Sequence, residues 1–287
     1  MNNTTLIARC LPALLLAGLW TAPATAGVDE IIAQFPAPNA KEADALFDAL
    51  LHEGEEAITG LCGQLVPMGE GDDNAVRYAL TGLARHASRP DAGDAQDTVE
   101  DALLAGLANA ADPEIQCFLL RQLQQCGTNA SVNAIDEFLL DDAVASNAIL
   151  ALDALGTRKA KRALTQALNE TTGTTQLQLL SVLSDDGRNR TAARVATQRL
   201  DSTADANEYV HLLSILVALK SNGANDHLIA AMDREEPRIR KAALSHAAPL
   251  TDRFAERKWR KKLADPGLSD AARQEIGAML EAAIANP

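Results

Sequence analysis

The sequence is poor in aromatic residues and in cysteine, and both shortages narrow the functions it can have. Aromatic side chains make up 3% of the 287 residues. After residue 26 only three cysteines remain, Cys62, Cys117 and Cys126. So few aromatics offer no stacking platform for nucleotide bases or sugars, and three cysteines in so long a chain do not make a disulfide framework. Runs of β-branched residues are scarce while Ala and Leu dominate, which favours an all-helical fold.

The sequence motifs of common catalytic and metal sites are also missing. There is no Gly-x-Ser-x-Gly nucleophile elbow and no glycine-rich phosphate loop. The five histidines are scattered, and none has another His, Cys or carboxylate at the helical spacings of zinc sites. The acidic pairs lack the alternating oxygen ligands of a calcium loop. We therefore expect no catalytic residue, no metal and no cofactor.

No hydrophobic segment that we identify is long enough to cross a membrane. The apolar run from Cys10 to Trp20 has 11 residues, whereas a spanning helix needs roughly 20. The run follows a positively charged start and precedes Ala24-Thr25-Ala26, so residues 1–26 are predicted to be a secretory signal peptide. A buried N-terminal helix is the alternative. Cleavage near Gly27 would place the mature protein in the periplasm or outside the cell.

Export would place the three cysteines in an oxidising compartment. If Cys117 and Cys126 share one helix, the nine-residue separation at ~1.5 Å per residue puts them about 13 Å apart. That distance is too long for a disulfide. A bridge between Cys62 and Cys117 across neighbouring helices stays open, and the alternative is that all three are small buried apolar residues.

What the chain does contain is a repeated helical pattern that ends in glycine. Its four glycines lie 29, 31 and 36 residues apart, at Gly127, Gly156, Gly187 and Gly223. Each has a large aliphatic residue seven positions before it and a leucine four positions before it: Leu120 and Leu123, Ile149 and Leu152, Leu180 and Leu183, Leu216 and Leu219. This period is typical of stacked helical hairpins. We expect each glycine to end its helix in a left-handed conformation.

The repeats are expected to form one continuous array. The clearest helix opens at Asp112-Pro113-Glu114, where proline suits the first turn and acids favour the helix start. Residues 27–111 are predicted to form divergent repeats, and residues 112–287 regular ones with closing helices. In the divergent part, helices are predicted at 40–52, 54–65, 74–88 and 95–110. Near the end, Pro249 is expected to replace glycine as the helix stop.

Two segments resemble HEAT repeats, above all the short HEAT-like repeats of bacterial proteins. Residues 236–244, Glu-Pro-Arg-Ile-Arg-Lys-Ala-Ala-Leu, show an acidic residue, proline, a variable position, isoleucine, arginine and then alanines. The start of the helix at Asp112 matches in part, with Gln116 in the arginine position. The resemblance covers residues 70–265. It implies an α-solenoid, a right-handed superhelix of helical hairpins.

A weaker resemblance concerns residues 76–84, Val-Arg-Tyr-Ala-Leu-Thr-Gly-Leu-Ala. This segment is similar to the helical region that precedes sugar-hydrolase-like domains in some secreted bacterial proteins. The chain carries only the helical region, so the resemblance implies no hydrolytic activity of its own.

Charge is distributed unevenly along the chain. Residues 27–150 contain 22 acids and 5 bases, whereas residues 151–287 contain 17 acids and 20 bases. The bases recur about once per repeat, so they are predicted to form a ridge that binds an anionic partner through summed potential. The candidate contacts are Arg194, Arg199, Arg238, Arg240 and Lys241. The alternative is that these bases are merely the solvated face of successive helices.

Together these features predict a non-catalytic exported scaffold that binds another protein. The ridge of bases would favour a partner with an acidic surface. Nucleic acid is disfavoured because acids outnumber bases by 39 to 26. One alternative is an enzyme or accessory protein that processes carbohydrates or tetrapyrrole-bearing proteins. The tetrapyrrole case would be lyase-like, because some HEAT-like proteins are lyases of that kind. A pure structural spacer is another.

Overall fold

The computed structural model describes residues 27–185, 187–221, 223–247 and 253–285, and the regular structure in these ranges is entirely helical. The first helices are α1 (Val28–Ile32), α2 (Ala40–Glu53), α3 (Glu55–Cys62), α4 (Asn74–Ala87), α5 (Asp94–Asn109), α6 (Pro113–Cys126), α7 (Val132–Asp136) and α8 (Ala145–Leu155). The others are α9 (Arg158–Ala167), α10 (Gly173–Asp185), α11 (Arg190–Ser202), α12 (Ala206–Ala218), α13 (Ala224–Ala231), α14 (Pro237–Ala247), α15 (Arg253–Leu263) and α16 (Asp270–Ala285). The predicted signal peptide and Pro249 lie outside the described residues.

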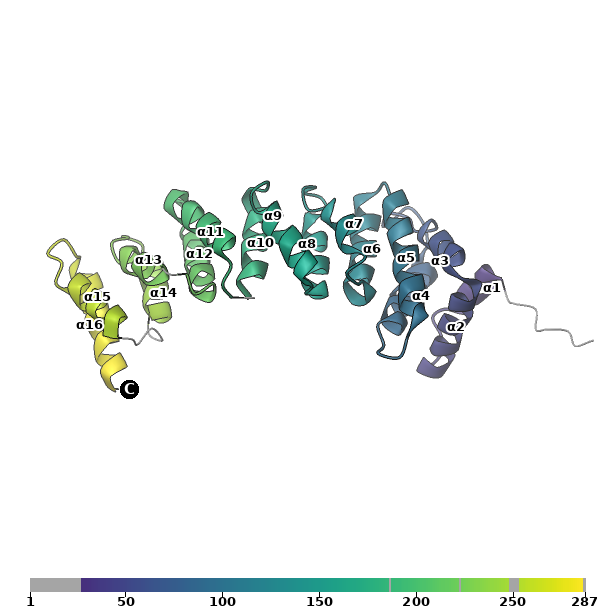
Figure 1. The fold of residues 1–287 in the computed structure, drawn as a ribbon, viewed down its shortest axis with the longest axis horizontal. Coiled ribbons are helices and arrows are strands. Elements are labelled where there is room, and N and C mark those ends of the chain that lie inside the picture. The colour runs from purple at the N-terminus through teal and green to yellow at the C-terminus, as the bar shows by residue number, and fades with distance from the viewer. Residues whose placement is uncertain (1–26, 186, 222, 248–252, 286–287) are drawn as a thin grey trace, which may run out of the picture.

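The even-numbered helices form one uninterrupted row. From α2 to α16 each of them packs against the next even-numbered helix, and each odd-numbered helix from α3 to α15 packs against at least one even-numbered helix beside it. The helices therefore follow one another in chain order along the long axis of an elongated, arched molecule (Figure 1). Because α6 packs against both α4 and α5, the core continues across residues 111 and 112.

The predicted helices before Asp112 are confirmed to within three residues at each end. The start of α6 also agrees with the sequence pattern, since Pro113 occupies its first position. The Asp112 carboxylate accepts hydrogen bonds from the backbone N–H groups of Glu114 (2.8 Å) and Ile115 (3.4 Å). These bonds satisfy two of the amides that a helix start leaves without partners.

The aliphatic residues of the glycine-terminated pattern are buried. All eight, from Leu120 to Leu219, are at most 2% exposed, and they belong to one apolar core that runs along the array. Full burial of one such side chain contributes about 1.5–3 kcal/mol. This strip of aliphatic side chains is what holds successive helices together.

Two of the four glycines end their helices in the way the sequence predicts. Gly156 (φ 60°) and Gly187 (φ 81°) are left-handed. The prediction is wrong at Gly127, which is extended, and at Gly223, which precedes α13 in a right-handed conformation. At Gly127 an added Cβ would lie 2.5 Å from the carbonyl oxygen of Leu123. There glycine is needed because the chain passes close to the helix end, and not for a left-handed turn.

Among the described residues, none of the helices combines the length and the apolar character that a bilayer span requires.

Candidate functional site

The five basic residues predicted as contacts fall into two groups. Arg194, Arg238 and Lys241 are exposed. Arg199 is half-buried and Arg240 is 7% exposed, so these two are not free to meet a partner. The predicted ridge of five residues is therefore corrected to three.

Arg240 is occupied entirely within the chain. Its Nη1 donates to the backbone carbonyls of Arg234 (3.0 Å) and Glu235 (2.8 Å), and its Nε lies 3.1 Å from a carboxylate oxygen of Glu275 in α16. The guanidinium thus ties the loop before α14 to the next even-numbered helix.

The position of Arg240 in its helix recurs along the array. It is the fourth residue of α14, and the fourth residues of four other even-numbered helices also donate to carbonyls of the loop that precedes their helix: Arg77, Gln116, Gln176 and Arg273. A long side chain with several N–H donors is needed there because loop carbonyls buried without partners are costly. The arginine position of the HEAT-like pattern is therefore structural, which explains why Arg240 is not a surface contact.

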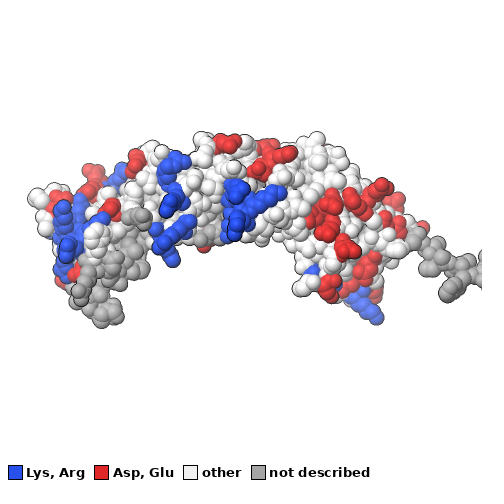
Figure 2. Space-filling model, in the orientation of Figure 1, with Lys and Arg blue, Asp and Glu red and all other residues white. Residues whose placement is uncertain are grey.

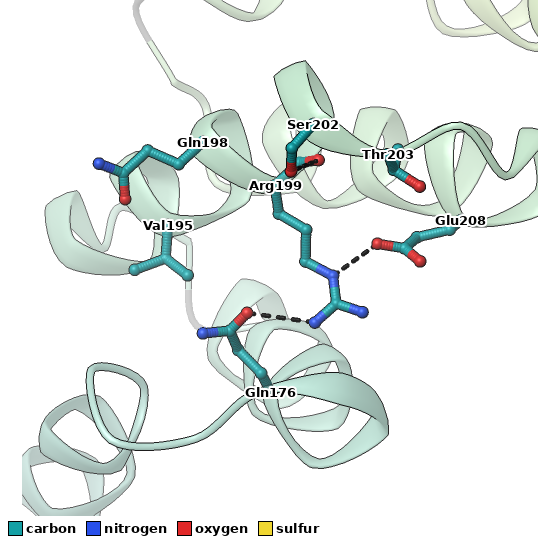
Figure 3. A pocket seen from close by; sticks show the side chains of 7 residues that line it. All are labelled: Gln176, Val195, Gln198, Arg199, Ser202, Thr203 and Glu208. Atoms are coloured by element: carbon teal, nitrogen blue, oxygen red, sulfur yellow. Dashed lines mark hydrogen bonds and ion pairs between the residues drawn. The ribbon is translucent and has the colours of Figure 1, made fainter.

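Arg199 lines an open pocket of about 460 Å³ between α10, α11 and α12. Figure 3 shows its guanidinium between Glu208 and Gln176. Its Nε lies 2.5 Å from a Glu208 carboxylate oxygen, and its Nη1 donates to Gln176 (3.1 Å) and to the carbonyl of Gly173 (2.7 Å). Arg199 consequently joins three successive helices rather than presenting its charge outward.

The bases that recur along the sequence are placed more regularly on two odd-numbered helices than their spacing predicted. The first and fifth residues of α9 are Arg158 and Arg162, and those of α11 are Arg190 and Arg194. All four are exposed. Residues four apart lie on the same face of a helix, so each helix carries a pair of arginines one turn apart. The helix boundaries were the missing signal, because the equivalence appears only once both helices are known to begin at arginine.

Most of these arginines have no internal role. The side chains of Arg158, Arg162 and Arg190 make no hydrogen bond or ion pair within the described part of the chain. Arg194 donates to the side chains of Asn169 (2.8 Å) and Gln198 (3.0 Å), which are both exposed. The α15 helix adds further exposed bases, Arg257, Arg260 and Lys261. We call the exposed bases of α9, α11 and α15 the basic stripe.

Two arginines of the basic stripe, Arg158 and Arg190, stand where local electrostatics disfavours them. Arg158 and Lys159 open α9, and Arg190 opens α11; neither first turn contains an acid. The positive end of the helix dipole penalises a base in the first turn by about 0.3–1 kcal/mol. These bases therefore do not stabilise the starts of their helices.

Most odd-numbered helices divide by charge between α7 and α9, and the exception is α13, which contains Asp226 and no Lys or Arg. The helices α3, α5 and α7 contain no Lys or Arg, and their exposed acids are Glu55, Glu56, Asp94, Asp97, Asp101 and Asp136. By contrast, α9 contains no Asp or Glu, and α11 contains only Asp201. Figure 2 shows the outcome on one face, with acids over the N-terminal helices and clusters of bases over the C-terminal half.

A group of titratable side chains surrounds His86. Its Nδ1 lies 3.4 Å from an Asp44 oxygen and its Nε2 lies 3.1 Å from an Asp48 oxygen. Arg89 donates to Asp44 (2.7 Å), and this bond holds the pKa of Asp44 below its usual value. Both ring nitrogens thus face carboxylates of α2, so His86 links α4 to α2. Within the described residues no group of three or more His, Cys, Asp or Glu side chains can hold a metal ion.

A buried acid also serves the fold. Glu100 is 2% exposed and accepts hydrogen bonds from the backbone N–H groups of Thr128 (2.8 Å) and Ser131 (3.1 Å), and from the hydroxyls of both residues. The carboxylate therefore supplies acceptors to the loop that follows α6.

The three cysteines are free thiols, so the bridge between Cys62 and Cys117 that the sequence left open is not formed. Burial raises the pKa of Cys62 and that of Cys126 to about 12. The pKa of Cys117 is also raised, first by burial and then by Asp141 and Glu114 acting against Arg121.

These pKa values predict a simple pattern of thiol reactivity. At pH 8 a thiol of pKa about 12 is ionised in about one molecule in ten thousand, and only the thiolate attacks a disulfide reagent. In a chain that starts at Gly27, we expect a thiol-reactive disulfide to modify Cys117 slowly and to reach Cys62 and Cys126 only after unfolding in denaturant. A Cys117→Ser variant should be unreactive until it unfolds. Rapid modification of two or three thiols in the folded protein would contradict the burial described here.

Comparison with known proteins adds little to this description. No family model matches the chain, and no curated protein matches it. One solved structure, from "Computational Design of Self-Assembling Cyclic Protein Homooligomers", aligns over 91% of this chain and 92% of that one, at 12% identity and a TM-score of 0.15. A score this low carries no argument about fold or function.

Proposed function

We propose that this chain is a HEAT-like α-solenoid that serves as a non-catalytic scaffold for another protein, exported to the periplasm or beyond. The uninterrupted row of even-numbered helices supports the solenoid, because each helix packs against near neighbours in the chain. The recurring donor at the fourth helix position supports it too, since a repeat array reuses one solution to the same local problem.

The binding surface in this proposal is the basic stripe. The observation that carries this proposal concerns Arg158 and Arg190. Both are exposed and occupy the first positions of α9 and α11, where the helix dipole disfavours a base. A row of such bases attracts an acidic partner through its summed potential, and repeated helices extend the contact without any catalytic group. The partner expected from this chemistry is a protein with an acidic surface.

The test is affinity capture from the exported fraction of the source cells. Arg158→Glu with Arg190→Glu should reduce the captured partner by about tenfold, because two attractive contacts become repulsive. The matched control is Lys41→Glu with Arg121→Glu, which makes the same change in net charge at exposed positions of α2 and α6. The control should capture the partner as the unmodified chain does.

The same variant has a second expected result that separates binding from folding. Because it replaces bases by acids in the first turns of α9 and α11, it should unfold at the same temperature as the unmodified chain or slightly above it. Loss of capture with unchanged or higher stability supports the proposal. Capture that is equal in the variant and the control removes the basic stripe as the binding surface.

A further inference from the structure

The opposite charges of the odd-numbered helices make the face in Figure 2 complementary to itself. Acids lie over the helices before α8 and bases over α9, α11 and α15 of the same face. From this arrangement we infer that a second copy of the chain binds this face in antiparallel orientation. The inference rests on the proposed function in one respect, because it uses the basic stripe as a binding surface.

Symmetry decides which pairing of two copies is favourable. A two-fold axis that crosses the long axis at right angles, in the plane of Figure 2, reverses the chain direction of the second copy and lays its arch over that of the first. Acidic helices of each copy then meet basic helices of the other, twice. A parallel pairing would instead set acids against acids. An interface of this isologous kind closes at two copies.

The charge boundary places the axis more closely. Because the change of sign falls between α7 and α9, an axis at that boundary sets α7 against α9 and α5 against α11. It also sets α3 against α13, which has no base, so the attraction comes from the pairs nearer the axis. The exposed acids Asp97 and Asp101 of α5 would then oppose the exposed Arg190 and Arg194 of α11. Within each of these pairs the two residues lie four positions apart, so each pair forms one stripe on its helix.

The long-range field restricts the association to this alignment. From Gly27 to Pro287 the chain has 39 acids against 25 Lys and Arg, so two copies repel each other in most orientations. Attraction between exposed charges is screened over about 10 Å at 0.1 M salt and over about 30 Å at 0.01 M. Salt screens the repulsion between the two net charges as well. Because the opposed charges would be in contact while the net charges act over longer distances, the dimer is expected at about 0.1 M salt and should dissociate as more salt is added.

The experiment is sedimentation velocity of the purified chain, with two variants measured alone and together. One variant is Arg190→Glu with Arg194→Glu in α11, and the other is Asp97→Lys with Asp101→Lys in α5. At about 0.1 M salt the unmodified chain should sediment as a dimer, and each variant alone as a monomer, because like charges now face each other. An equal mixture of the two variants should form the dimer again, since both contacts regain opposite charges. Circular dichroism of each variant checks that it is folded.

Three outcomes would overturn the inference: a monomeric unmodified chain at this salt concentration, a dimer in either variant alone, or a monomeric mixture. A species that grows beyond two copies would also overturn it, because an open head-to-tail contact does not close. The α5 variant keeps the basic stripe intact. If this variant is monomeric and still captures the partner from cells, the chain binds its partner without forming the dimer, and the proposed function stands. If it captures nothing while the unmodified chain dimerises, the dimer stands and the proposed function fails.

Discussion

Replacing Arg240 by alanine is expected to lower the free energy of unfolding by about 3 kcal/mol. The substitution leaves the carbonyls of Arg234 and Glu235 without their charged donor and removes the partner of Glu275. The effect should be large because the guanidinium is only 7% exposed, so water cannot readily replace its hydrogen bonds. Urea unfolding followed by circular dichroism at 222 nm measures the change.

Lys241 provides the control for this prediction, because it is the next residue in α14 and is exposed. Lys241→Ala should change the free energy of unfolding by no more than about 0.5 kcal/mol. Arg240→Lys should recover only part of the loss, since an ammonium cannot reach two carbonyls and a carboxylate in the planar arrangement of a guanidinium. Equal stability of the alanine variants at 240 and 241 would show that Arg240 has no structural role.

Two glycine-to-alanine substitutions in neighbouring helices are expected to have opposite signs. Gly106 is buried in α5, where an added Cβ would lie 2.5 Å from Cβ and 2.8 Å from Sγ of Cys62 in α3. Because both atoms stand close to a helical backbone, the two helices must move apart. Gly106→Ala should therefore lower the free energy of unfolding by about 3 kcal/mol.

Gly60 in α3 has no atom within 4 Å of the position an added Cβ would take. Gly60→Ala should raise the free energy of unfolding by about 0.5–1 kcal/mol, because alanine loses less backbone freedom than glycine when a helix forms. Thermal unfolding of both variants beside the unmodified chain checks the two signs. A stabilising Gly106→Ala would mean that α3 and α5 are not in close contact.

Much of the secondary structure could be predicted from the sequence because the signals are local. Apolar residues at helical spacing predicted the helices before Asp112 to within three residues. The eight aliphatic residues of the glycine pattern are buried because a helical stripe of that width has to be covered. The conformations of the glycines were harder to predict, because a glycine can be required either by a left-handed turn or by the close approach of another chain segment. Gly156 and Gly127 look alike in sequence and differ in this respect.

The candidate site could be predicted only in outline. Net charge showed that the bases lie in the second half of the chain, but it could not separate an arginine that points to solvent from one that binds loop carbonyls. Arg238 and Arg240 illustrate this, because they stand two residues apart on different faces of α14, one exposed and the other buried. The stripe on α9 and α11 required knowing that both helices begin at arginine.

The sequence by itself determined that this protein is all-helical and that its charge changes sign along the chain, because helical periodicity and net charge are properties of neighbouring residues. Only the tertiary structure decided which bases are free and which hold helices together. Arg199 and Arg240 meet partners 9 to 35 residues away, Glu208 and Glu275, and such contacts depend on how successive helices pack. The shortage of cysteine and aromatic residues in the sequence argued against several functions. The fold then showed that the arginines of α9 and α11 are exposed, and these form the surface to test.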